Sequence, residues 1–183
     1  SMTNVPALVS TTACFAAGLL EHALVEGVNM VNAEMLARER GIEIIEQKST
    51  EHGDFTTVIH SEVETERKTY IAAGTVFGRE FLRLVRLGAF HLDAYLDGTL
   101  LIFSHQDVPG IIGNIGTILG KHCVNIAAMT VGREKPGGEA IAVLNLDNEP
   151  PAAAVKEVLA HPNISTASVV KLPPAAAMPP WLP

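Results

Sequence analysis

The order of hydrophobic segments over residues 98–172 constrains the fold more than any other feature of this chain. Stretches with apolar residues at every second position alternate with stretches of helical spacing. The expected strands are residues 99–104, 124–133, 139–146 and 164–172, and the expected helices are residues 109–122 and 150–160. Each expected helix has a proline in its first turn, where backbone N–H groups have no acceptor within the helix, so the absence of an N–H on proline costs no hydrogen bond. This β-α-β-β-α-β order predicts a ferredoxin-like domain.

The first half shows a different pattern, in which two helices precede an antiparallel sheet. The expected helices are residues 11–26 and 33–40, and the expected strands are residues 42–47, 56–64, 68–76 and 81–87. Asp97-Gly98 is a turn signal that separates the halves. The sequence therefore predicts an α+β chain. An α/β domain with an antiparallel sheet spans residues 1–97, the ferredoxin-like domain spans residues 98–172, and a proline-rich tail, expected to be flexible, spans residues 173–183.

The balance of charges and the cysteine count exclude several classes of protein. The chain has 13 Lys and Arg against 20 Asp and Glu, a net charge of −7, which argues against a nucleic-acid partner. Polar residues interrupt the uncharged start and the first basic residue is Arg38, so we expect neither a signal peptide nor a membrane span. Cys14 and Cys123 are expected to be buried free thiols. We therefore expect a cytoplasmic protein and, without HxxxH or HExxH spacing, no metal site.

A polar segment, His105-Gln106-Asp107, lies between the first strand and the first helix of the ferredoxin-like half. The helix start offers free N–H groups and a partial positive charge, which suit a carboxylate. Asp107 suits an ammonium group, and His105 and Asn125 provide side-chain hydrogen bonds. Gly110 begins a series of glycines that let a ligand or a second chain approach the backbone closely. The pattern predicts a binding site for a zwitterion such as a free amino acid.

Two simpler interpretations compete with this one. Asp107 could only cap the helix, and His105 could be an ordinary surface residue. The residues alone leave these alternatives about evenly balanced with a binding site. The glycines at positions 110, 113 and 116 do not form GxGxxG, so they give no support to a nucleotide site.

Residues 101–128 closely resemble the ACT domain, in the form found in D-3-phosphoglycerate dehydrogenase, the first enzyme of serine biosynthesis. The shared pattern is a strand, then His-x-Asp-x-Pro-Gly, an Ile-rich helix and Val-Asn-Ile-Ala. In that family L-serine binds at the interface of two ACT domains. The resemblance implies a homodimer formed through ACT pairing, in which His105, Asp107 and Gly110 of one chain and Asn125 of its neighbour contact L-serine. Some members have Asn at the position of Asp107.

The first half resembles the intervening domain of the longer D-3-phosphoglycerate dehydrogenases. The matching stretches are residues 26–33, 36–42, 73–78 and 91–93. This domain is thought to be an allosteric site for an anion or a substrate. The resemblance makes Arg79, Arg83 and Arg86 the candidates for anion binding, because arginine pairs well with phosphate or carboxylate. The alternative is that these arginines form a solvated strand face paired with nearby acids.

No complete active site is expected. The chain lacks GxGxxG after a strand, 183 residues cannot also hold the family's catalytic domains, and the intervening domain looks truncated at its start. The interpretation is a regulatory module of an NAD-dependent enzyme, without a cofactor in this chain and with NAD bound by the missing catalytic part. The alternatives are the regulatory β portion of an iron–sulfur L-serine dehydratase and a stand-alone ACT protein that binds an amino acid. The Val-Asn-Met-Val-Asn-Ala run at residues 28–33 favours the dehydrogenase.

Overall fold

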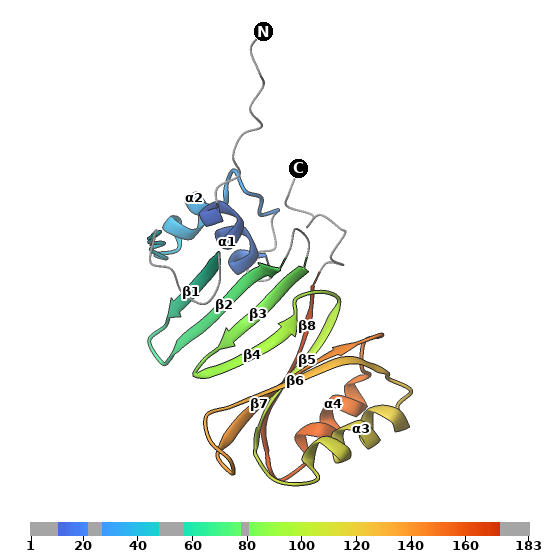
Figure 1. Cartoon of the computed structure of the whole chain (residues 1–183). Helices are drawn as coiled ribbons and strands as arrows, with labels where there is room; N and C mark the ends of the chain where they lie inside the picture. Colours follow the sequence, from blue (N-terminus) through green and yellow to red (C-terminus); the bar gives the residue numbers. More distant parts are fainter. Residues whose placement is uncertain (1–10, 22–26, 48–56, 78–80, 173–183) are drawn as a thin grey trace. The chain divides into compact units, whose positions relative to one another are not determined.

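The structure is a computed structural model, and it describes residues 11–21, 27–47, 57–77 and 81–172 (Figure 1). The helices are α1 (Thr11–Leu20), α2 (Ala33–Glu39), α3 (Ile111–Lys121) and α4 (Ala152–Leu159). The strands are β1 (Val58–Glu64), β2 (Thr69–Phe77), β3 (Phe81–Leu87), β4 (Phe90–Tyr95), β5 (Thr99–Gln106), β6 (Ile126–Arg133), β7 (Glu139–Leu146) and β8 (Ile164–Lys171). The expected α+β class is confirmed. The expected tail lies outside the described residues, as do residues 22–26 at the end of the first expected helix.

By their contacts these elements form two compact units, and α1 and α2 belong to the smaller one. This unit is built on small side chains. Ala16 and Ala17 of α1 are fully buried together with Ala33 of α2. Alanine combines the highest helix propensity with a side chain of one carbon, so the two helices can lie close together.

The strand expected over residues 42–47 is wrong, because this segment runs beside the helices without regular backbone pairing. Ile44 packs against the alanines of α1 and α2, and Glu46 accepts a hydrogen bond from the Thr12 hydroxyl. A strand needs a neighbouring strand to pair its N–H and C=O groups. The helices that adjoin this segment have already paired theirs internally.

The larger unit begins with an antiparallel sheet in the order β1-β2-β3-β4. The sequence predicted β1, β2 and β3 and missed β4. A two-residue turn at Gly88-Ala89 joins β3 to β4, and Gly88 has φ +60°, which suits the first turn position of a hairpin. The pairing of β3 with β4 shifts register between Leu84 and Arg86. The bulge leaves the alternation of β4 itself intact, because its sequence Phe-His-Leu-Asp-Ala-Tyr places the more buried side chain at every second position. The signal for this strand was therefore present in the sequence.

The second sheet has the order β6-β7-β5-β8, which is the antiparallel arrangement expected for a ferredoxin-like domain. Figure 1 shows α3 and α4 on one face of this sheet. Alternate residues of β5, Leu101 and Phe103, are fully buried on the helix side with Ile115 and Leu119 of α3. Burying each of these large side chains stabilises the fold by about 1.5–3 kcal/mol.

The other face of the second sheet is covered by the first sheet. Leu100 of β5 and Val143 of β7 belong to one buried cluster with Leu84 of β3 and Ala94 of β4. As a result β7 is buried from Ala140 to Leu146, on both of its faces. A strand with two covered faces has a nearly continuous apolar sequence, which explains the Ala-Ile-Ala-Val-Leu run of β7.

Two small features join the sheets at their contact. The Asn145 side chain in β7 donates hydrogen bonds to the carbonyl oxygens of Tyr95, at 3.1 Å, and Asp97, at 3.3 Å, and so holds the short connection between β4 and β5. Gly132 of β6 lies where a Cβ atom would stand 2.7 Å from the carbonyl oxygen of His91 in β4. The close approach of these two strands therefore requires glycine at position 132.

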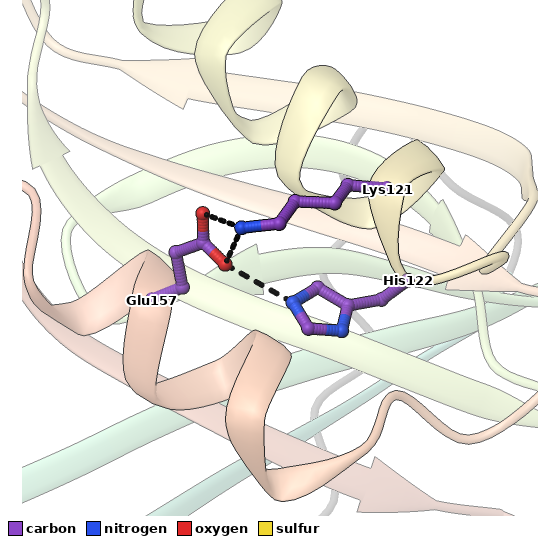
Figure 2. Close-up of polar contacts among 3 residues, drawn as sticks. All are labelled: Lys121, His122 and Glu157. Atoms are coloured by element: carbon purple, nitrogen blue, oxygen red, sulfur yellow. Dashed lines mark hydrogen bonds and ion pairs between the residues drawn. The ribbon is translucent and has the colours of Figure 1, made fainter.

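A polar cluster connects the end of α3 to α4 (Figure 2). Lys121 Nζ lies 3.0 Å and 3.1 Å from the two carboxylate oxygens of Glu157, and His122 Nε2 lies 3.0 Å from Oε2. The hydrogen bond from His122 and then that from Lys121 lower the pKa of the Glu157 carboxyl. The cluster is thus present at neutral pH, and its contribution to stability is lost as pH falls through the lowered pKa.

The substitution Gly132→Ala should destabilise the larger unit by about 1–3 kcal/mol, because backbone atoms of β4 must move to admit the Cβ atom. Urea unfolding would measure the change. Gly18→Ala in α1 is the control, since a Cβ there meets nothing within 4 Å and should slightly stabilise the helix. Equal stability of the Gly132→Ala variant and the wild type would contradict the close contact between β6 and β4.

Candidate functional site

A cavity of about 470 Å³ opens where α3 begins. Its walls come from the end of β5, the loop and first turn of α3, and the end of the edge strand β6. The lining residues are His105, Asp107, Val108, Pro109, Gly110, Ile111, Ile112, Gly113, Val131 and Arg133. Its volume is in the range of small-molecule sites. Three of the four predicted effector residues therefore line one cavity.

His105 is placed by β5 rather than by a loop, because the strand extends to Gln106. Its side chain is on the helix-facing side with Phe103, and the two ring centres are 5.4 Å apart. His105 is only 3% exposed, so the interpretation of this residue as an ordinary surface histidine is wrong. Nδ1 lies 2.9 Å from the carbonyl oxygen of Gln106, whereas Nε2 is buried without a hydrogen-bond partner in the described part of the chain. A buried polar atom of this kind costs about 1–3 kcal/mol, so a bound polar group would find a strong partner there.

Asp107 does not cap the helix. Its Oδ2 accepts a hydrogen bond from Arg133 Nη1 at 2.7 Å and another from the Gly137 N–H at 3.1 Å. The Arg133 guanidinium and then the Gly137 N–H hold the pKa of the Asp107 carboxyl below its ordinary value. The cavity wall thus carries one negative and one positive side chain that are already paired with each other.

Gly110 is the residue before the first turn of α3, and it has φ +88° with no side chain capping the helix. A Cβ atom at Gly110 would meet nothing within 4 Å, so the glycine is needed for its left-handed backbone and not for space within the chain. The N–H groups of the first turn, at Ile111, Ile112 and Gly113, belong to residues that line the cavity. They form the partly positive helix end that the sequence analysis expected to face a carboxylate.

Asn125 lies away from this cavity within one chain. Its Nδ2 donates to Asp147 Oδ2 at 2.6 Å, just before β6, whereas Arg133 ends that strand at the cavity. The glycines of α3 at positions 113, 116 and 120 also contact nothing within the chain at their Cβ positions. The chain alone therefore does not bring Asn125 together with His105 and Asp107.

Sequence reasoning missed Arg133. The signal was present in the strand register, because Arg133 of β6 is opposite Ala140 of β7, which is opposite His105 of β5. This row puts Arg133 and His105 on the same face of the sheet. The Pro-Gly-Gly hairpin fixes the register of β6 against β7. Placing Arg133 beside His105 also requires the register of β7 against β5, which is not a local feature of the sequence.

The candidate anion residues of the first sheet have partners of their own. Arg83 pairs with Asp93 at 3.2 Å and lies 3.6 Å over the ring of Tyr95. Arg86 Nε donates to the carbonyl oxygen of Gly88 at 3.0 Å. Arg79 lies outside the described residues. Anion binding on this sheet stays a prediction, and the Arg83 pair is the kind of contact that the alternative interpretation expects.

The cysteines do not form a site. Cys14 is half-buried, with its Sγ 3.6 Å from Met30 Sδ, whereas Cys123, expected to be buried, is exposed in the turn after α3. Both thiols are free. In the described residues no group of three or more His, Cys, Asp or Glu side chains is placed to hold a metal ion. None of the described helices is long and apolar enough to span a membrane.

The second sheet and its two helices thus form a ferredoxin-like domain with a ligand-sized cavity at the start of its first helix. Residues 99–163 match the ACT domain family, and residues 3–88 match the family of D-3-phosphoglycerate dehydrogenase intervening domains. This pair of domains fits the C-terminal regulatory region of D-3-phosphoglycerate dehydrogenases.

The chain is similar to D-3-phosphoglycerate dehydrogenases from bacteria and an archaeon. It is 36% identical to the enzyme of Bacillus subtilis (strain 168) over 162 residues, 32% to that of Methanocaldococcus jannaschii over 158 residues, and 37% to that of Synechocystis sp. over 155 residues. These alignments cover 88%, 86% and 85% of this chain and 31%, 30% and 28% of the relatives. The chain thus spans about a third of the length of the curated relatives it matches.

The substitution Arg133→Gln should raise the pKa of the Asp107 carboxyl, because the largest cause of its lowering is removed. The contribution of ionised Asp107 to stability is present above the ordinary pKa and is lost as pH falls through the lowered one, so the variant should lose it at a higher pH. Carboxyl ¹³C NMR titration would measure the pKa. Lys135→Gln, with the same change of charge nearby, should leave it unchanged. An unshifted Asp107 pKa in Arg133→Gln would contradict the ion pair.

The substitution Gly110→Val should destabilise the domain by about 1–2 kcal/mol, since a β-branched residue must adopt the left-handed backbone at this position. Gly110→Asn should cost less, because asparagine tolerates this conformation. Denaturant unfolding of the two variants provides the comparison. Equal losses for valine and asparagine would show that the backbone conformation is not the reason for the glycine.

Proposed function

We propose that this chain is the regulatory region of a cytoplasmic, NAD-dependent D-3-phosphoglycerate dehydrogenase of serine biosynthesis, and that it binds L-serine as a feedback effector between two ACT domains. The observation that carries the proposal is the buried, unpartnered Nε2 of His105 beside the start of α3. The match of residues 3–88 to the intervening domain of this dehydrogenase favours it over a serine dehydratase or a stand-alone ACT protein.

The groups around the cavity complement a small zwitterion. The α3 N-terminus offers N–H donors for a carboxylate, and Asp107 offers an acceptor for an ammonium group. His105 Nε2 is a buried partner for a hydroxyl, since an imidazole nitrogen can donate or accept according to its tautomer. A hydroxyl-bearing amino acid satisfies all three, whereas valine would leave the imidazole nitrogen unpaired.

The edge of the sheet supports pairing with a second chain. β6 is an edge strand, and Met129 and Val131 along it are 46% and 37% exposed. An exposed edge of this kind is a template for strand pairing. If two copies pair antiparallel about Met129, the backbone of Asn125 in the second copy lies opposite Arg133, because both residues are four positions from the centre. Such pairing supplies the missing Asn125 to the cavity.

Regulation then follows from the position of the effector across the seam. Serine can shift the assembly only by the difference in its affinity for two arrangements, typically about 1–3 kcal/mol of coupling. In the complete enzyme that difference would restrain the domain motion that turnover needs. NAD and the substrate belong to the catalytic part of such an enzyme.

Calorimetric titration with L-serine, glycine, valine and phenylalanine tests the ligand. We expect L-serine to bind at least tenfold more tightly than valine, a difference of about 1.4 kcal/mol, because only serine provides the hydroxyl. Equal affinities for L-serine and valine would contradict L-serine as the specific ligand.

The substitution Asn125→Ala should weaken L-serine binding by roughly tenfold, the effect of losing about one hydrogen bond, and should leave the fold intact. Asn148→Ala, at an exposed asparagine beyond the end of β7, is the matched control and should bind as the wild type does. Calorimetry and circular dichroism give the two readouts. An Asn125→Ala chain with wild-type affinity would remove this residue from the site.

A further inference from the structure

Arg133 is the one cationic side chain among the residues that line the α3 cavity in the described part of the chain. It ends β6 and is on the same side of the sheet as His105. Its side chain is 52% exposed, and its hydrogen bond to Asp107 uses Nη1 alone. A guanidinium has five N–H donors in a rigid fork, so most of its capacity to bind an anion remains.

We propose that Arg133 binds the carboxylate of the effector, and that the effector enters the site by exchanging with the Asp107–Arg133 ion pair. The ligand's carboxylate takes the place of Asp107 on Arg133, and its ammonium group takes the place of Arg133 on Asp107. This inference rests on the proposed effector site and names the residue and the ligand class that the site selects.

The exchange is favourable because it keeps every charge compensated. A zwitterion brings one positive and one negative group, so opening the pair leaves neither Asp107 nor Arg133 without a partner. A carboxylic acid without an amine would leave Asp107 without its cation, and an amine without a carboxylate would leave Arg133 without its anion. A zwitterion gains a charge-assisted hydrogen bond at each of its two ends, whereas a simple acid or amine gains only one, so the site selects α-amino acids over simple acids and amines.

Opening the pair is also within reach energetically. Ion pairs with an exposed partner contribute little, because water competes for both groups. The Gly137 N–H still donates to Asp107 Oδ2 when Arg133 turns away, so the carboxylate keeps its position on the hairpin. The N-terminus of α3 lies along the same cavity and adds to the attraction for the ligand's carboxylate.

The alternative is that Arg133 only positions Asp107. A ligand without a carboxylate distinguishes the two roles, because a contact between Arg133 and the carboxylate disappears with that group while a positioning effect remains. L-Serinamide has the ammonium and the hydroxyl of L-serine with a neutral amide in place of the carboxylate. At about pH 6.5 its amine is largely protonated.

The test is calorimetric titration of L-serine and L-serinamide into the wild-type chain, Arg133→Gln and Arg133→Lys. The wild type should bind serine roughly 10- to 100-fold more tightly than serinamide, the range for a hydrogen bond to a charged group. Arg133→Gln should lose that factor for serine, whereas its affinity for serinamide should be unchanged or higher, because no Asp107–Arg133 ion pair then has to open. Arg133→Lys should recover part of the lost affinity for serine, since lysine keeps the positive charge but lacks the planar guanidinium that can donate two parallel hydrogen bonds to a carboxylate. Lys135→Gln is the control with the same change of charge, and its serine affinity should be that of the wild type.

The outcomes separate this inference from the proposed function. Equal losses for serine and serinamide in Arg133→Gln would show a positioning role and overturn the inference alone, as would serine binding that Arg133→Gln leaves intact. A wild-type chain that binds neither ligand would overturn the proposed function and this inference with it. Thermal unfolding of each variant checks that the fold is retained.

Discussion

The burial of the central strands on two faces is the constraint on which the rest of this structure depends. Ala142, Val143 and Leu144 of β7 are each no more than 1% exposed, with the helices on one side and the first sheet on the other. A slip of one residue in such a strand would exchange the two faces, so the register is strongly fixed. The register in turn places His105 and Arg133 in one row, and it is this row that gives the cavity its charged and polar wall.

The polar groups that line the cavity differ in whether their hydrogen-bonding capacity is satisfied within the chain. The His105 imidazole is buried with one nitrogen unpartnered in the described chain, whereas the Asp107–Arg133 pair is satisfied and partly exposed. The unpaired nitrogen of His105 destabilises the empty site, and a ligand that hydrogen-bonds to it removes that destabilisation. The Asp107–Arg133 ion pair contributes little to stability, so a ligand can replace it with little loss of free energy. A site built in this way is stable without a ligand and still gains free energy when a suitable one binds.

How much the sequence could predict depended on whether a feature was local. The helix start at Pro109-Gly110 and the order of the last six elements follow from periodicity and turn residues, and the structure has them within a few positions. Strand β4 alternates apolar and polar residues from Phe90 to Tyr95, so its local signal was present and was overlooked. The segment around Ile44 was wrongly predicted as a strand because its apolar residues pack on helices instead of a sheet. Arg133 was missed because its neighbour Asp107 is 26 positions away and only the pairing of strands brings them together.

Gly132 gives the arrangement a mechanical consequence. It precedes Arg133 in β6 and lies against the backbone of β4, so the strand that ends at the cavity also touches the preceding sheet directly. Close-packed contacts of this kind have low compressibility and pass strain on. A displacement of the end of β6 would therefore act on β4 across a backbone contact, with no flexible linker between the two to absorb the motion.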